Sequence, residues 1–165
     1  MSRNASLLLL HLIVFIFGWT GILGELITLP SNLIVLYRCA IASIALLAFG
    51  VFWKKLKPVP MGKMLKIMGV GVITGIHWLL FFESIKVSTV SVGVVILAST
   101  ALWVALFEPI VTRRKIDTRE LVLGLLVIIG VGVIFSVELQ YKWGIFLAIL
   151  SAIFAAMFSV FNGIL

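Results

Sequence analysis

Three ionisable side chains lie inside long apolar stretches of the sequence: His11, Arg38 and His77. An ionisable group in hydrocarbon is costly, so each of them needs a partner or a function. Arg38 could bind an anionic group such as a substrate carboxylate, pair with Glu25 or Glu83, or extend its head to the membrane interface. The histidines could carry protons or hydrogen-bond a substrate; the alternative for each is a buried, neutral, hydrogen-bonded imidazole.

Two tryptophans, Trp19 and Trp78, also lie within apolar stretches and could line a cavity. The candidate substrate-binding residues are therefore His11, Trp19, Arg38, His77 and Trp78. The sequence contains no nucleophile–base set, phosphate-binding loop or metal-ligand spacing, and neither histidine belongs to a Glu-x-x-His pattern. No catalytic residue, metal site or cofactor is therefore predicted.

Glu108 directly precedes Pro109 near the end of another apolar stretch. Proline can break or kink a helix and free a carbonyl group, so these two residues mark the expected helix break. Arg113 and Arg114 follow within reach of Glu108, which favours an ion pair at the membrane face. The alternative function is a small integral-membrane enzyme or accessory membrane subunit that uses His77 or Glu108.

The composition requires lipid as the solvent of these stretches. Of 165 residues, 63% are hydrophobic and 12% are charged, and the mean hydropathy is +1.31. A soluble domain is nearer half apolar and a quarter charged. The net charge of +7 would suggest nucleic acid in a soluble protein. Here the cations stand in short clusters between apolar stretches, so no nucleic-acid partner is expected.

Six apolar stretches are long enough to cross a membrane as helices. The first is expected to be an uncleaved span, because no small-x-small cleavage site follows it. A polar turn over Ser84–Ser88 separates the third span from the fourth. The expected spans are Ala5–Leu26, Leu33–Trp53, Met64–Phe82, Val90–Val111, Leu121–Val137 and Trp143–Leu165. The expected fold class is an all-α, polytopic membrane helix bundle.

Charge counting orients this bundle. Lys86 and Lys142 lie in two of the breaks, whereas ten cations precede the first span or surround the alternate breaks. The ten are Arg3, Lys54, Lys55, Lys57, Lys63, Lys66, Arg113, Arg114, Lys115 and Arg119. The positive-inside rule places the N-terminus and the lysine-rich break in the cytoplasm.

Glycines at helical spacing mark expected helix contacts. Gly18 and Gly21 share one face of the first span, and Gly71 and Gly75 form a Gly-x-x-x-Gly pair in the third. Small residues let helix backbones approach closely where no hydrophobic effect drives association. Plain packing is the simpler interpretation, and sliding of these helices during a transport cycle is the functional one.

Several short motifs match, in order and spacing, those of a known family. They are His11–Trp19, Leu36–Ala40, His77–Lys86, Glu108–Pro109 and Thr118–Phe135. The chain resembles the EamA-type permeases of the drug/metabolite transporter superfamily. This resemblance implies a secondary transporter of a bacterial-type inner membrane that works by alternating access and exports amino acids or related small metabolites.

The resemblance also implies two repeats of five spans in opposite orientation, with the substrate bound between them. Residues 1–137 correspond to the first five-helix repeat, and residues 143–165 to the first helix of a truncated second repeat. A weak internal sequence similarity aligns Ile16–Trp19 with Ile153–Ala156. We expect the 165 residues to be a transporter fragment. Its expected partners are a small-molecule substrate, the lipid bilayer, and a missing second repeat or a second copy in a homodimer.

Overall fold

A computed structural model describes residues 3–54, 56–135 and 139–165. The elements are α1 (Arg3–Leu26), α2 (Ser31–Phe52), α3 (Met61–Lys86), α4 (Val90–Leu97), α5 (Thr100–Thr112), α6 (Thr118–Phe135), the 3-10 turn η1 (Leu139–Tyr141) and α7 (Lys142–Gly163). The described part of the chain thus contains helices and their connections, without strands. The all-α, polytopic fold predicted from the sequence is confirmed.

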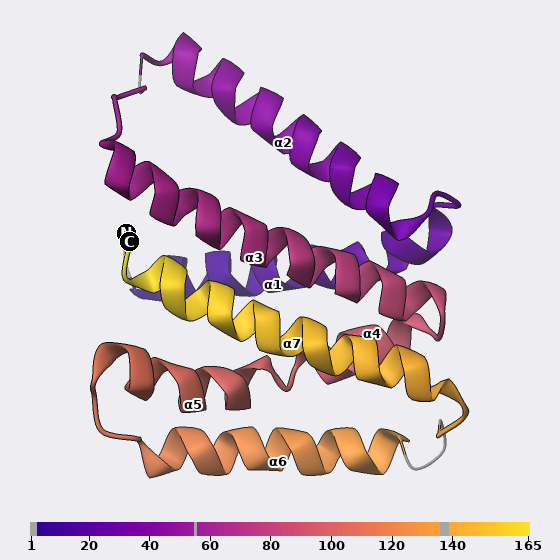
Figure 1. Ribbon diagram of the computed structural model, residues 1–165. Helices are drawn as coiled ribbons and strands as arrows, with labels where there is room; N and C mark the ends of the chain where they lie inside the picture. The colour runs from indigo at the N-terminus through magenta and orange to yellow at the C-terminus, as the bar shows by residue number, and fades with distance from the viewer. Residues whose placement is uncertain (1–2, 55, 136–138) are drawn as a thin grey trace.

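Helix α7 lies at the centre of the bundle. It packs along α3 and also contacts α4 and α5. Figure 1 shows α2 beyond α3 on one side, and α5 and α6 on the other. Small side chains let the backbone of α7 approach its neighbours closely. Those buried on α7 are Gly144, Ala148, Ser151, Ala152, Ala155 and Ala156.

Five stretches of the described residues have the length and hydropathy of membrane spans: α1, α2, α3, Val90–Thr112 and α7. The fifth span predicted from the sequence corresponds to α6, which is 18 residues long. At 1.5 Å per residue it extends about 27 Å, close to the ~30 Å of the hydrocarbon core. Figure 1 shows α6 alongside α5. Its predicted end at Val137 lies outside the described residues, so the number of six crossings stays a prediction.

Helix α3 is longer than the sequence predicted. It ends at Lys86, so the polar turn expected over Ser84–Ser88 is wrong for its first three residues. The serines are compatible with this helix because their hydroxyls bond to its own carbonyl groups. Ser84 Oγ donates to the Phe81 carbonyl oxygen at 2.8 Å, and Ser88 Oγ donates to that of Ser84. The extra turn places two charged residues on the helix rather than in a loop.

The fourth predicted span forms two helices. It is interrupted at Ala98 and Ser99, between α4 and α5. The backbone N–H groups of Ala98 and Ser99 donate to the carbonyl oxygens of Val95 and Ile96, three residues earlier, at 3.1 and 2.9 Å. This tighter 3-10 pattern keeps the backbone groups bonded where the α-helical geometry ends.

The helix break expected at Glu108 and Pro109 is therefore wrong. Helix α5 continues through Pro109 and ends at Thr112. A proline lacks one N–H, so the Ala105 carbonyl loses its helical donor. The helix tolerates this loss because Pro109 lies in its last turn. The helix then ends with Arg113 in the left-handed conformation, at φ 58°.

Of the four glycines predicted at helix contacts, Gly21 has close neighbours. A Cβ built there would lie 2.8 Å from a side chain of α4. Apart from the adjacent residues and the nearby backbone of the same helix, no atom of the described chain lies within 4 Å of a Cβ built at Gly18, Gly71 or Gly75. Their packing role therefore stays a prediction, because the described chain places no neighbouring helix against these three glycines. Helix α3, for example, contacts α7 through His77, which lies across the helix from Gly75.

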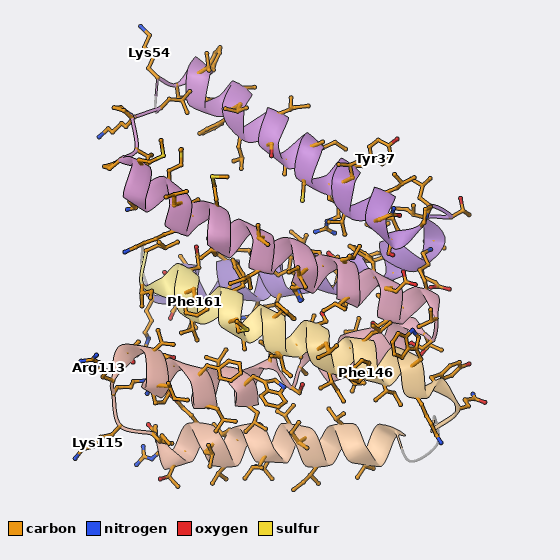
Figure 2. All side chains as sticks on the ribbon, in the orientation of Figure 1. Tyr37, Lys54, Arg113, Lys115, Phe146 and Phe161 are labelled. Carbon is orange, nitrogen blue, oxygen red and sulfur yellow. The ribbon has the colours of Figure 1, made fainter. Side chains whose placement is uncertain are left out.

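Basic side chains mark one end of the bundle. Figure 2 shows Lys54, Arg113 and Lys115 at the end where Figure 1 places both termini. Lys55 lies outside the described residues. This grouping agrees with the charge counting that puts this end in the cytoplasm.

A reporter enzyme active only in the cytoplasm is expected to be active when inserted after Pro60. A reporter active only outside the cytoplasm is expected to be active after Lys86. Both results follow from the excess of cations at the end that contains Pro60. Each reporter is measured at each site and corrected for the amount of fusion protein. The opposite pattern would contradict the orientation, and activity of the same reporter at both sites would contradict the crossing predicted between them.

Candidate functional site

Arg38 and Trp78 form the centre of the candidate site. The guanidinium carbon of Arg38 lies 4.1 Å from the centroid of the Trp78 ring and 5.4 Å from that of Phe82. Stacking of a cation on an aromatic face contributes about 0.5–2 kcal/mol, more where water is excluded. Arg38 is the eighth residue of α2, which places it about 10 Å along the helix from its first residue. The charge is therefore held at hydrocarbon depth.

A groove opens beside this pair. Its volume is about 150 Å³, and it is lined by Val35, Arg38, Cys39, Ala42 and Trp78. Arg38 is the one charged residue of this lining. Figure 1 shows that α2 and α3 are close at this end and diverge toward the other, and most of α2 beyond the groove is exposed. Apolar walls with a single well-placed cation suit a small ligand that carries an anionic group.

His77 joins α3 to α7 and adjoins Trp78, one of the residues that line this groove. Its side chain is buried, with 6% of the residue exposed. Nδ1 lies 2.9 Å from both the carbonyl oxygen and Oγ of Ser151, and Ser151 Oγ donates to the His77 carbonyl oxygen at 3.1 Å. A carbonyl oxygen accepts only, so this network assigns the proton to Nδ1. The other ring nitrogen, Nε2, is then the atom that can accept a proton.

The aromatic residues connect these two parts of the site. The ring centroids of His77 and Trp78 are 5.1 Å apart, so Arg38, Trp78 and His77 form one continuous series across α2 and α3. Of the five residues predicted for the substrate site, the structure brings these three together.

A buried apolar cluster holds α2 against α3 in the position that brings Arg38 to Trp78. A Cβ built at Gly24 of α1 would lie 2.5 Å from the Phe82 ring, so the backbone of α1 also contacts the cluster. Burial of such side chains stabilises each by about 1.5–3 kcal/mol. The cluster consists of Ile34, Phe81, Phe82 and Ile85. It fixes the first turns of α2, and with them Arg38, against α3.

Polar contacts join the same ends of these helices. Ser31 Oγ donates to a carboxylate oxygen of Glu83. Lys86 Nζ donates to the carbonyl oxygens of Ile27 and, at 3.4 Å, Glu25. The last carbonyl groups of a helix lack helical donors, and a nearby lysine is a favourable partner for them. The connection between α1 and α2 is thereby tied to the end of α3.

Neither of the carboxylates considered as partners of Arg38 pairs with it. Glu83 accepts the Ser31 hydroxyl instead. The ion pairs among the described residues belong to Arg114. Arg38 therefore keeps its charge stacked on Trp78, without a carboxylate partner in the described part of the chain.

The ion pair predicted for Glu108 is present. Arg114 Nη2 lies 3.2 Å from Glu108 Oε2 and 2.7 Å from Glu120 Oε2. The hydrogen bond to Glu120, with the added field of Glu108, holds the pKa of the Arg114 guanidinium above its ordinary value. Arg114 thus links the end of α5 to the start of α6. This link is structural and lies away from the Arg38 groove.

His11 and Trp19 lie outside the groove, on the exposed side of α1. His11 is exposed, and its Nδ1 is 2.7 Å from the Leu7 carbonyl oxygen of its own helix. Trp19 is 51% exposed, and its ring contacts Phe15 one turn earlier. The structure does not bring these two candidates to Arg38 and His77.

Ser151 was missed by sequence reasoning. It is fully buried and bonds to the His77 ring, yet a single serine in an apolar stretch carries little signal. The pattern that could have pointed to it is the run of small residues around it. Small side chains recur at four-residue intervals, at Gly144, Ala148, Ala152 and Ala156. Such a strip predicts close contact with another helix, and a serine within it can bond across that contact.

Among the described residues, no three His, Cys, Asp or Glu side chains lie close enough together to hold a metal ion. The fold and the site define a polytopic membrane protein with polar groups held inside its helix bundle. A family model described as the EamA-like transporter family matches residues 4–136. The chain therefore belongs to the EamA-like transporter family of the drug/metabolite transporter superfamily, and it is a membrane transporter. No curated protein and no solved structure matches the chain.

Proposed function

We propose that the protein is a secondary transporter that exports amino acids or related small metabolites by alternating access. Arg38 holds the carboxylate of the substrate in the groove between α2 and α3. The observation that carries this proposal is the guanidinium of Arg38, stacked on Trp78 at hydrocarbon depth and without a carboxylate partner among the described residues. An arginine presents a planar fork of donors that matches a carboxylate, and stacking on Trp78 orients that fork in advance.

The His77–Ser151 pair supplies a second polar contact next to the groove. With Nδ1 donating to Ser151, Nε2 is the acceptor, and it can take a hydrogen bond from an ammonium group. A carboxylate at Arg38 and an ammonium group at His77 would use both ends of an amino acid. This arrangement supports an amino acid or a related metabolite as the substrate class.

We further propose that residues 1–137 form the first of two repeats and that residues 143–165 begin the second. The family match over residues 4–136 has nearly the same extent as the proposed first repeat. His11 and Arg38 are exposed at hydrocarbon depth, where a polar group facing lipid is costly. A second repeat, or a second copy of the chain, would cover these groups and complete the site. The proposed location is a bacterial-type inner membrane.

The proposal is tested by flux in proteoliposomes. The chain, extended by a second five-helix repeat, is reconstituted and assayed with a panel of radiolabelled amino acids and their decarboxylated amines. We expect efflux of one or more amino acids and little efflux of the matching amines, because the amines lack the group that Arg38 binds. Equal flux of both would contradict the role of Arg38. No flux above protein-free liposomes would favour the alternative, a membrane enzyme or accessory subunit.

A further inference from the structure

A second groove lies between α3 and α7 at the basic end of the bundle. Its volume is about 310 Å³, and both helices contribute to its walls. Lys66 is the one charged lining residue, and Gly69, Ile73 and Phe161 are among the apolar ones. Apart from the adjacent residues and the nearby backbone of α3, no atom of the described residues lies within 4 Å of a Cβ built at Gly69, so this glycine leaves the hollow open. Figure 2 shows Phe161 near the end of the bundle marked by Lys54.

The groove crosses the level at which the membrane interface meets the hydrocarbon. Helix α3 has 26 residues, about 39 Å of helix against a hydrocarbon core of ~30 Å, so each end extends a few ångströms beyond it. Lys66 lies about 8 Å from the first residue of α3, close to that boundary. A lysine there extends its ammonium group to the headgroup level. Gly69 and Ile73 follow deeper, at the level of acyl chains.

The charge of this end fits an anionic occupant. Lys63 stands one turn before Lys66 on α3, and the side chains that line the groove include no acidic one. Basic pockets between spans on the cytoplasmic side are suited to anionic lipid headgroups. An apolar channel that leads inward from a cation suits a molecule with a phosphate at one end and a hydrocarbon chain at the other.

We propose that this groove binds an anionic phospholipid. Its phosphate contacts Lys66, and one acyl chain lies along Gly69 and Ile73 against α7. The bound lipid fills the space between α3 and α7 at the cytoplasmic end and so stabilises the contact between these helices. This site is separate from the Arg38 groove and does not depend on the transport activity.

The test is native mass spectrometry of the purified full chain, with phosphatidylglycerol or phosphatidylcholine added at equal concentration. We expect phosphatidylglycerol to bind about fivefold more tightly, the effect of one lysine near the membrane surface. Lys66→Gln is expected to remove this preference, and Lys66→Arg to keep it. Gly69→Leu fills the hollow and is expected to weaken binding of both lipids.

Two matched variants serve as controls. Lys57→Gln removes a charge from the connection before α3, and Gly62→Leu adds a side chain at a glycine of α3 outside the groove; both should bind lipid as the unchanged protein does. Equal loss in Lys57→Gln would show diffuse attraction and overturn the site. Full competition by glycerol phosphate would show that a free anion suffices and overturn it as well. If Gly69→Leu left lipid binding unchanged but converted a dimer to a monomer in light scattering, a second copy would be the occupant and the proposal would be wrong.

Discussion

Replacement of Arg38 by leucine is expected to abolish amino-acid flux while the protein still inserts into the membrane. Leucine keeps an apolar side chain in the groove but removes every donor to the substrate carboxylate. Loss of one partner from a desolvated charge pair costs about 2–5 kcal/mol, so flux at low substrate concentration should fall by about 30-fold or more. The measurement is the initial rate of labelled amino-acid flux in proteoliposomes, divided by the amount of reconstituted protein.

Arg38→Lys is the matched variant for this experiment. It keeps the positive charge but lacks the planar fork and stacks less well on Trp78, so weak flux should remain. Arg119→Leu, at the start of α6, removes a charge far from the groove and should transport normally. Normal flux in Arg38→Leu would show that the guanidinium only packs on Trp78 and has no contact with the substrate.

The second large effect concerns the proposed second repeat. Proteoliposomes that contain the 165-residue chain alone are expected to show no flux above background. Flux is expected to appear when the same chain is extended by a second five-helix repeat. The physical reason is that the Arg38 groove lies on an open face of the bundle. A substrate bound there would contact binding groups of the first repeat alone, without those that a second repeat would supply on the opposite side. Flux is measured per reconstituted chain at equal lipid-to-protein ratio.

An insertion control separates loss of function from loss of protein. Both forms must appear in the membrane fraction and show the same reporter pattern after Pro60 and Lys86. Robust flux from the 165-residue chain, running as a monomer in light scattering, would show that the proposed second repeat is unnecessary. Flux from a dimer of this chain would instead show that a second copy supplies the other side of the substrate site.

The sequence predicted the fold class well because lipid imposes a simple rule. Spanning segments must satisfy their backbone groups internally and stay apolar over about 20 residues. The bounds of α1 and α2 therefore agree with the predicted first two spans to within two residues at each end. Helix ends were harder to predict. The serines at the end of α3 bond to the helix itself, which hydropathy does not detect, and the break at Ala98 and Ser99 has no glycine or proline to mark it.

The candidate site was predicted in part. Arg38, His77 and Trp78 could be chosen because polar and aromatic groups inside apolar stretches need an explanation. Which of them meet depends on how each helix is rotated about its axis, and hydropathy carries no information on rotation when every face is apolar. His11 and Trp19 were therefore grouped with Arg38, although they face away from it. Ser151 was missed for the converse reason, since its importance arises from its contact with His77.

The interruption at Ala98 and Ser99 divides one membrane crossing into two helices with different neighbours. On its outer side, α4 is packed against α1, α3 and α7. On its inner side, α5 is joined to α6 through Arg114, and both halves contact α7. The backbone N–H groups of Ala98 and Ser99 follow the tighter 3-10 pattern, so this crossing consists of two separate helices. Each helix shares α7 as a neighbour and has a further set of neighbours of its own.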